Sequence, residues 1–447
     1  MQPWPKPDFP ELPEHSALPI RVFDSKTQSL PEVAPSPTAT IYTCGITPYD
    51  ATHIGHANTY VAFDLLNRIW RDAGKQIVFS QNITDVDDPL LERAYKTGVE
   101  WQDLAASQID LFRGDMAALR VMPPDYWITV SEAMPEIIAT VTSLLRSGSA
   151  YFIHHYPDAD EFMDVYFDIT KDPNLGCVAH LPYDEALELF AARGGDPERP
   201  GKRNKLDPLL WRAERFGEPW WDGGVLGRGR PGWHIGCTVI ARDTLGDVFD
   251  VTGGGSDLLF PHHEMSSSLA RVLTDNPEAG ANYFIHCGMI SYQGEKMSKS
   301  LGNLVIVSDL IKAGVDPMAI RLALLSHHYR TDWEWTDQEL KSAQQRLEIY
   351  RVLLLGSQEK NSRHPAAQSV EEPQSGVSKP RGAQDLLSAQ IDPSDAEDQV
   401  VLEIRKALSD DLNAPKALAA IDNYIANNGK PSQIITNALN TLLGIKL

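Results

Sequence analysis

The order of apolar and polar positions in the first 80 residues predicts a strand, a helix and a second strand. Residues 38–44 form a short apolar run that is typical of a buried strand, and residues 57–71 carry apolar side chains at helical spacing. Residues 76–80 form the next apolar run. Because a helix between two buried strands is the repeating unit of parallel sheets, this pattern predicts the start of an α/β nucleotide-binding domain.

Farther along, Gly and Pro interrupt the helical patterns between about residues 100 and 225, which indicates an insertion that splits the sheet. Apolar runs at 247–251 and 283–290 indicate that the sheet resumes, and helical periodicity covers 340–355. The predicted units are 1–125, first half of the nucleotide-binding domain; 126–225, inserted domain; 226–310, second half; 311–356, helical region; 357–397, flexible linker; and 398–447, a small C-terminal helical module.

Composition narrows the class of protein. The chain has 447 residues, of which 42% are hydrophobic, enough for a sizeable core and two or three domains. The N-terminal residues lack the features of a signal peptide, and no apolar run approaches the roughly 18 residues of a membrane span, so we expect a cytoplasmic protein without a membrane partner. A formal charge of −21 argues against a broad nucleic-acid-binding surface. Ser, Gln, Glu, Pro and Lys dominate the linker, which is typical of disorder.

Two short signatures suggest ATP chemistry. His53-Ile54-Gly55-His56 lies at the predicted strand-to-helix turn, where two imidazoles and a helix N-terminus favour phosphate and Gly55 allows close approach of the nucleotide. Lys296-Met297-Ser298-Lys299-Ser300 lies far downstream, and its lysines can neutralise the charge of a departing pyrophosphate. Together they predict an enzyme that activates a carboxylate with ATP. The alternative is an exposed basic loop and two surface histidines.

Cys44, Cys237 and His262 are candidate metal ligands, because two thiolates and an imidazole make an incomplete tetrahedral zinc site. Spacing alone is a weak signal, since isolated cysteines are usually buried apolar residues and His-His pairs usually lie on the surface. An open fourth position would distinguish a substrate thiolate, which binds Zn²⁺ strongly, from a serine hydroxyl. The site would thereby select cysteine.

Taken together, the two signatures and three further segments resemble the cysteinyl-tRNA synthetase group of class I adenylate-forming enzymes. The further segments are Thr84–Asp88, Arg230–His234 and Gly253–His263, and the resemblance covers residues 20–350. It implies a Rossmann-type (HUP) α/β catalytic domain with the HIGH and KMSKS motifs, an inserted connective domain, a helical region at 311–356 like a stem-contact fold, and a C-terminal helical bundle.

Within that group the chain is most similar to the cysteine ligases of mycothiol biosynthesis. Ile46-Thr47-Pro48 and the final His56 match the ligases, and Ser266 replaces the glutamate that is the fourth zinc ligand of the synthetases. Residues 193–197 resemble a ligase segment, although Ala192 replaces its usual preceding glutamate, and the small C-terminal module leaves little to grip an anticodon. Gly236 departs from the usual glutamate, and the linker lengthens the chain, which keeps a cysteinyl-tRNA synthetase as the alternative. A catalytically silent binding protein is a third hypothesis.

The resemblance implies that ATP activates L-cysteine as an adenylate, whose carbonyl the amine of glucosaminyl-inositol then attacks with release of AMP. One Zn²⁺ on Cys44, Cys237 and His262 and Mg²⁺ with ATP are implied, and we expect a monomer with small-molecule substrates and no nucleic-acid partner. The catalytic residues implied are His53, His56, Lys296 and Lys299. The implied pocket for cysteinyl-adenylate is formed by Cys44, Gly45, Ile46, Thr47, Thr59, Asn82, Ile83, Thr84, Trp233, Gly255, Ser256, Asp257 and Ile290. No general base is assigned.

Overall fold

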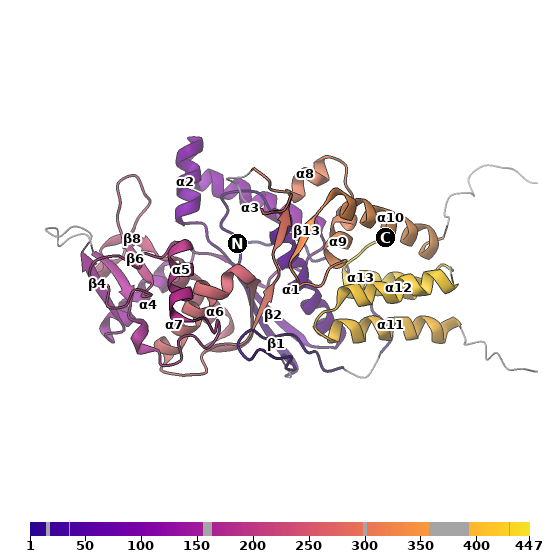
Figure 1. Cartoon of the computed structure of the whole chain (residues 1–447), viewed down its shortest axis with the longest axis horizontal. Helices are drawn as coiled ribbons and strands as arrows, with labels where there is room; N and C mark the ends of the chain where they lie inside the picture. Colours follow the sequence, from indigo (N-terminus) through magenta and orange to yellow (C-terminus); the bar gives the residue numbers. More distant parts are fainter. Residues whose placement is uncertain (15–17, 35, 155–162, 298–301, 357–392, 429) are drawn as a thin grey trace, which may run out of the picture.

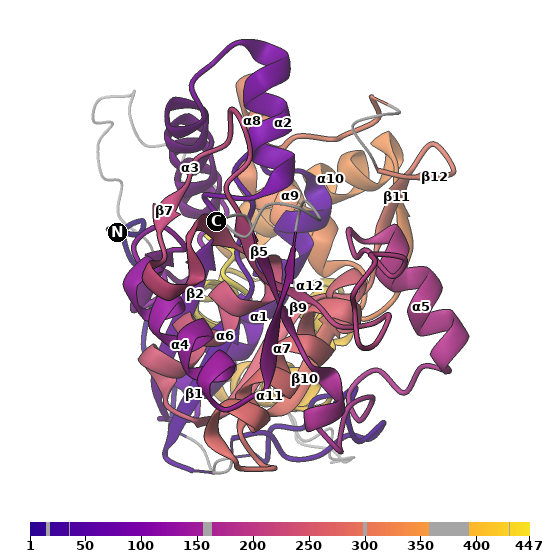
Figure 2. The same cartoon turned by 90° about the vertical axis from the view of Figure 1, so that its left-hand side faces the viewer.

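A computed structural model describes residues 1–14, 18–34, 36–154, 163–297, 302–356, 393–428 and 430–447. The molecule is elongated, with one antiparallel sheet at one end, a parallel sheet near the middle and the C-terminal helices at the other end (Figure 1). Figure 2 shows the same arrangement from the end that carries the antiparallel sheet. No helix among the described residues is long and apolar enough to cross a membrane.

The central sheet has the order β10-β9-β1-β2-β3, and all of its strands are parallel. Its strands are β1 (Thr38–Thr43), β2 (Gln76–Ile83), β3 (Tyr126–Thr129), β9 (Val248–Gly255) and β10 (Gly280–Cys287). The helices that connect or cover them include α1 (Ile54–Asp72), α2 (Asp88–Thr97), α3 (Trp101–Ala118), α6 (Trp233–Leu245) and α7 (Glu264–Thr274). The chain runs outward from β1 in both directions, so the ends of β1 and β9 open a crevice at the point where ligands bind in such sheets. The predicted α/β class with a parallel sheet is confirmed.

The inserted domain is a five-stranded antiparallel sheet of order β4-β5-β6-β8-β7. Its elements are α4 (Met134–Arg146), β4 (Ala150–His154), β5 (Met163–Phe167), α5 (Tyr183–Ala192), β6 (Leu209–Ala213), β7 (Trp221–Asp222) and β8 (Arg228–Pro231). Both predicted boundaries differ from the structure by a few residues. Strand β3 starts at Tyr126 but pairs with β2 in the central sheet, and β8 belongs to the inserted sheet although it follows residue 225. Both strands are only four residues long, which is too short for apolar alternation to place them reliably.

The remaining elements cover the other side of the central sheet. They are β11 (Ile290–Tyr292), β12 (Glu295–Lys296), α8 (Val307–Lys312), α9 (Pro317–Leu325), β13 (Trp333–Trp335), α10 (Asp337–Leu354), α11 (Pro393–Ser409), α12 (Ala414–Asn428) and α13 (Gln433–Leu443). Helix α11 begins inside the segment assigned from sequence to the linker, and the rest of that segment lies outside the described residues. Strands β11, β12 and β13 form a third small sheet.

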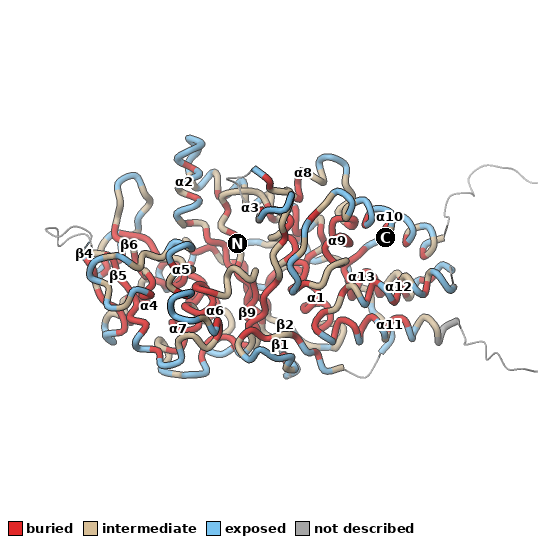
Figure 3. Tube along the Cα trace, in the orientation of Figure 1, coloured by how far each residue is buried: buried red, intermediate tan, exposed pale blue. Residues whose placement is uncertain are grey.

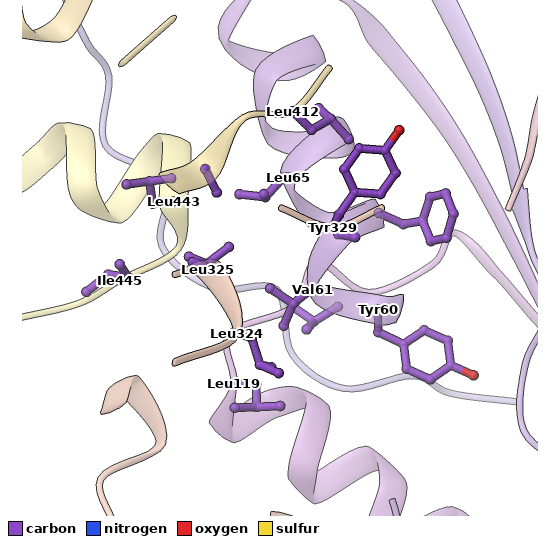
Figure 4. Packing of buried hydrophobic residues seen from close by; sticks show 14 of the residues in the cluster. Tyr60, Val61, Leu65, Leu119, Leu324, Leu325, Tyr329, Leu412, Leu443 and Ile445 are labelled. Atoms are coloured by element: carbon purple, nitrogen blue, oxygen red, sulfur yellow. The ribbon is translucent and has the colours of Figure 1, made fainter. Parts of the chain in front are cut away.

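The C-terminal helices share one hydrophobic core with the central sheet. Side chains from α1, α9 and the end of the chain meet there, including Val61, Leu65, Leu325, Leu443 and Ile445 (Figure 4). Buried residues accordingly run without interruption from the central sheet into the helices at this end (Figure 3). The described helices after residue 393 therefore share their core with the parallel-sheet domain.

A buried ion cluster reinforces this junction. Asp64 of α1 accepts from Arg68 at 2.6 Å and from Arg321 of α9, and all three side chains are fully buried. Other guanidinium N–H groups donate to main-chain carbonyls. Arg68 donates to the carbonyl of Asn440 at 2.8 Å, and Arg321 donates to the carbonyl of Leu443 at 2.6 Å. Because a buried charge must be paired and hydrogen-bonded, α1 depends on the last helix of the described chain.

Candidate active site and metal centre

His53 caps the N-terminus of α1. Its Nδ1 accepts hydrogen bonds from the backbone N–H of Gly55 at 3.1 Å and of His56 at 3.4 Å. An accepting Nδ1 carries no proton, so the neutral ring holds its proton on Nε2. The His53 and His56 rings stack with centroids 3.8 Å apart. A Cβ on Gly55 would lie 2.8 Å from the His53 ring, so glycine here accommodates the folded-back imidazole as well as a ligand.

The second signature follows a tight hairpin of β11 and β12. Lys296 ends β12 and Met297 is buried, whereas Lys299 lies outside the described residues. The chain after this signature returns to the first one, since His53 and Ile306 form an isolated β-bridge and Ile54 N–H donates to the carbonyl of Val305 at 2.9 Å. Backbone hydrogen bonds therefore join the first signature to the chain that follows the second.

The three candidate metal ligands come together. One ligand atom from each of Cys44, Cys237 and His262 lies within 4.8 Å of the other two, and all three residues are buried. Cys44 follows β1, Cys237 lies on α6 and His262 precedes α7, so three elements that meet at the crevice supply the group. Interaction with Cys44 lowers the pKa of Cys237 well below its usual value, and interaction with Cys237 together with burial raises the pKa of Cys44. Among the described residues, no carboxylate joins this group.

Three further histidines surround these ligands. His234 Nδ1 lies 3.1 Å from His262 Nδ1, and the Trp233 ring stacks on His262 with centroids 4.6 Å apart. On the other side, His263 Nε2 lies 3.2 Å from Cys44 Sγ, and its Nδ1 lies 2.8 Å from His286 Nε2. Burial lowers the pKa of His234 and His263 well below the usual value, and that of His286 to about 3, so these rings are neutral at physiological pH.

Gly45 and Asn82 form the floor beside the thiols. A Cβ on Gly45 would lie 1.7 Å from the carbonyl oxygen of Asn82, so only glycine fits. Asn82 Oδ1 accepts from Gly45 N–H at 2.8 Å and from the Tyr42 hydroxyl at 3.0 Å, and its Nδ2 donates to the Thr84 hydroxyl at 3.0 Å. These bonds use the side chain of Asn82 to fix the backbone that follows Cys44.

One cavity of about 630 Å³ joins these parts. The residues expected from sequence that line it are Cys44, Gly45, Ile46, Thr47, His53, His56, Thr59, Asn82, Thr84, Trp233, Cys237, Gly255, Asp257, His262 and Ile290. Ile83 instead points into the hydrophobic core, and Ser256 is not among the lining residues. Of the lining residues that sequence reasoning missed, Tyr49, Asp50, Tyr60 and Arg193 carry polar side chains.

The inserted domain is tied directly to the elements that form the site. Arg193, at the end of α5, donates through Nη1 to the carbonyl of Asp257 at 2.7 Å and to that of Phe260. Glu264, fully buried at the start of α7, accepts three backbone N–H groups of the insertion, from Gly176, Val178 and Ala179, at 2.8 to 3.0 Å. The loop before His262 therefore cannot move independently of the inserted domain.

Comparisons with known proteins agree with this geometry. Residues 32–345 match the family model described as "tRNA synthetases class I (C) catalytic domain". A protein of Xylanimonas cellulosilytica, named L-cysteine:1D-myo-inositol 2-amino-2-deoxy-alpha-D-glucopyranoside ligase, is 52% identical over 100% of both chains, and a Streptomyces coelicolor protein of the same name is 48% identical over 100% of both. The methionyl-tRNA synthetase of Mycobacterium tuberculosis in complex with methionyl-adenylate has a TM-score of 0.56 at 15% identity, covering 91% of this chain and 88% of that one, which shows a shared fold.

Proposed function

The chain belongs to the family of L-cysteine:1D-myo-inositol 2-amino-2-deoxy-alpha-D-glucopyranoside ligases, which carry a class I tRNA synthetase catalytic domain, and we propose that it joins L-cysteine to the amine of glucosaminyl-inositol. The reaction consumes ATP, passes through cysteinyl-adenylate and serves mycothiol biosynthesis. One observation carries the proposal: the thiol and imidazole group and the two stacked histidines of the first signature line the same cavity.

The residues at the thiol end of the cavity fit a zinc ion. Two thiols and one imidazole are the donors that Zn²⁺ prefers, and a set of three protein ligands is typical of catalytic sites with one open position. His234 supports His262 as an outer partner in the way that ligating histidines usually require. Cys44, Cys237 and His262 would hold the ion. When bound there, zinc supplies a soft Lewis acid that takes the thiolate of cysteine in preference to the hydroxyl of serine.

In the first step, the carboxylate of cysteine attacks the α-phosphorus of ATP. The bond between the α-phosphorus and the oxygen that bridges to the β-phosphorus breaks, and pyrophosphate leaves. His53 keeps its Nε2 proton because Nδ1 accepts from the helix backbone, so it can donate to a phosphate oxygen without first gaining a proton. The α1 N-terminus favours the negative charge of the phosphate. Lys296 and Lys299 stabilise the leaving pyrophosphate, and Mg²⁺ accompanies ATP.

In the second step, the amine attacks the carbonyl carbon of the adenylate and AMP leaves with the bonding electron pair. Adenylation has already made the carbonyl electrophilic, so orientation of the amine contributes most of the remaining acceleration. We propose that the protein acts as a monomer in the cytoplasm, with small-molecule substrates and without nucleic acid.

A cysteinyl-tRNA synthetase is the other candidate. Helices α11 and α13 pack against α1 in the common core, so these described C-terminal helices belong to the body that carries the site. Measurement of AMP release from cysteine and ATP in the presence of either glucosaminyl-inositol or tRNA separates the two reactions. We expect turnover with the amino sugar only, and cysteine-dependent AMP release that needs tRNA would overturn the proposal.

A further inference from the structure

The cavity has a polar wall that neither ATP nor cysteine explains. The loop from Gly45 to Thr52 connects Cys44, at the thiol end, with His53, at the phosphate end. In cysteinyl-adenylate the reacting carbonyl lies between the thiol and the phosphate. The middle of this loop therefore runs past the carbonyl, and the side chains that it turns toward the cavity there are Tyr49 and Asp50.

Arg193 of the inserted domain lines the same cavity. It is held on the opposite, β9 side by its Nη1 bonds to the carbonyls of Asp257 and Phe260. Within the described part of the chain, only Nη1 of its guanidinium donates hydrogen bonds, so Nε and Nη2 keep N–H donors for a ligand. An arginine whose head is fixed by two carbonyls loses little further entropy when it binds a substrate.

The charge at this wall differs from that at the phosphate end. Burial and the carboxylates of Asp50, Asp87 and Asp257 raise the pKa of Tyr49, which places three acidic groups around one phenol. A phosphate would be repelled here, whereas an ammonium group and neutral hydroxyls would be accepted. Carboxylate, phenol and guanidinium groups together are suited to a polyhydroxylated amine, because they offer both acceptors and donors to adjacent hydroxyls.

We propose that Tyr49, Asp50 and Arg193 form the acceptor subsite, in which a polyhydroxylated amine binds with its nitrogen beside the carbonyl carbon of the activated cysteine. This inference rests on the proposed function. The amine arrives as an ammonium ion and gives up one proton before the attack. The N–C bond then forms, the bond from the carbonyl carbon to the phosphate oxygen breaks with its electron pair leaving on AMP, and the nitrogen loses its second proton. Both protons pass to the acidic wall and then to solvent.

The experiment compares Tyr49→Phe, Asp50→Asn and Arg193→Gln with the wild type in two assays. Cysteine-dependent pyrophosphate exchange reports the first step and the integrity of the fold, and AMP release at varied glucosaminyl-inositol reports the second. We expect the KM for glucosaminyl-inositol to rise at least tenfold in Asp50→Asn and Arg193→Gln, and less in Tyr49→Phe. In Tyr49→Phe and Asp50→Asn the KM for cysteine and for ATP should change less than twofold, whereas Arg193→Gln also removes the bonds to the carbonyls of Asp257 and Phe260 and is judged by its acceptor KM relative to its exchange rate. Tyr183→Phe and Asp184→Asn, exposed on α5 of the same insertion, are the matched controls.

The possible results separate the two proposals. Wild-type turnover together with an unchanged acceptor KM in all three variants overturns the subsite and leaves the ligase function standing. Loss of exchange at an unchanged acceptor KM assigns the residues to the first step and also overturns the subsite. Absence of any product from the wild-type enzyme overturns the ligase function, and the subsite with it.

Discussion

His53 and Ile306 form a β-bridge that joins the start of the first signature to the chain that follows the second. Val307 N–H extends the contact by donating to the carbonyl of Thr52 at 3.0 Å. The lysine loop is therefore anchored on one side by β12 and on the other by the residues that begin α1.

We expect Lys296→Ala and Lys299→Ala to slow adenylation by at least a hundredfold with little change in cysteine binding, because the lysines act on charge that develops in the transition state. Rapid-quench adenylate formation and isothermal titration with cysteine measure the two effects. Lys312→Ala, an exposed lysine on α8, serves as the control. Unchanged pyrophosphate-exchange rates in both variants would contradict the role of the loop.

Cys237→Ala should remove the bound zinc and cysteine-dependent pyrophosphate exchange while the fold persists, because the three-ligand group cannot lose one thiolate and keep its affinity. Mass spectrometry measures the loss of zinc, and far-UV circular dichroism tests whether the fold persists. Cys177→Ala removes a thiol of the inserted domain that lies outside the group and should keep one zinc per chain. Full zinc content in Cys237→Ala defeats the assignment.

Gly45→Ala should lower the rate of adenylation more than tenfold, because the added methyl group would overlap the Asn82 carbonyl and displace the backbone next to Cys44. Gly114→Ala is the matched control, since its Cβ meets nothing within 4 Å and lies inside helix α3. There the same substitution should stabilise the fold by about 0.5–1 kcal/mol. Equal activity of the two variants would rule out the steric argument.

Asp115 on α3 is buried, and burial raises its pKa to about 7. The folded protein therefore binds a proton that the unfolded chain releases near pH 4, so this residue lowers the free energy of unfolding as pH rises from about 4 to about 7. The nearby Thr52 hydroxyl and the charge of Lys312 oppose this rise in pKa, and the charge of Asp309 adds to it.

Asp115→Asn should remove this pH dependence and raise stability at pH 8 by on the order of 2–4 kcal/mol. Urea unfolding at pH 5 to 8 is the measurement. Asp103→Asn, exposed on the same helix, should leave the profile unchanged. If the free energy of unfolding of the wild type rises between pH 5 and pH 7, the sign is opposite to the expected one and the assignment is wrong.

Asp64→Asn should cost about 3–5 kcal/mol of stability, because it leaves Arg68 and Arg321 buried without their carboxylate. Burial opposes ionisation of Asp64, but the two guanidinium groups hold its pKa below the usual value, so its contribution is present at neutral pH and is lost only in acid. Chemical denaturation compares this variant with Glu92→Gln. Glu92 belongs to an exposed ion pair with Lys96 on α2, so its substitution should not shift the denaturation midpoint. A shift of less than 1 kcal/mol for Asp64→Asn would mean that the cluster is not energetically coupled.

Apolar periodicity located most elements to within a few residues, and the errors have physical causes. The first helix was predicted from residue 57 but starts at Ile54, because His53 acts as its cap and a histidine is not an expected capping residue. The second strand was predicted to end at residue 80 but continues to Ile83, because Gln81 and Asn82 are polar yet buried. Polar side chains that are satisfied by distant partners interrupt the local pattern on which prediction depends.

Site residues that belong to sequence motifs could be predicted, whereas those that tertiary contacts bring to the cavity could not. Cys44, Cys237 and His262 were proposed together and do lie together. Arg193 was noted only for its sequence context, and its place in the cavity depends on how the inserted sheet packs against β9. Ile83 was expected in the adenylate pocket, but strand alternation turns it into the core while Asn82 and Thr84 face the cavity.

The ion cluster also has a consequence for biosynthesis. Arg68 lies in the helix that His53 caps, yet two of its hydrogen-bond acceptors, the carbonyls of Asn440 and Thr441, are 372 and 373 positions later in the chain. A nascent chain still attached to the ribosome within α12 would hold that guanidinium without these acceptors. The helix that His53 caps can therefore reach its final environment only after the last described helix has been synthesised.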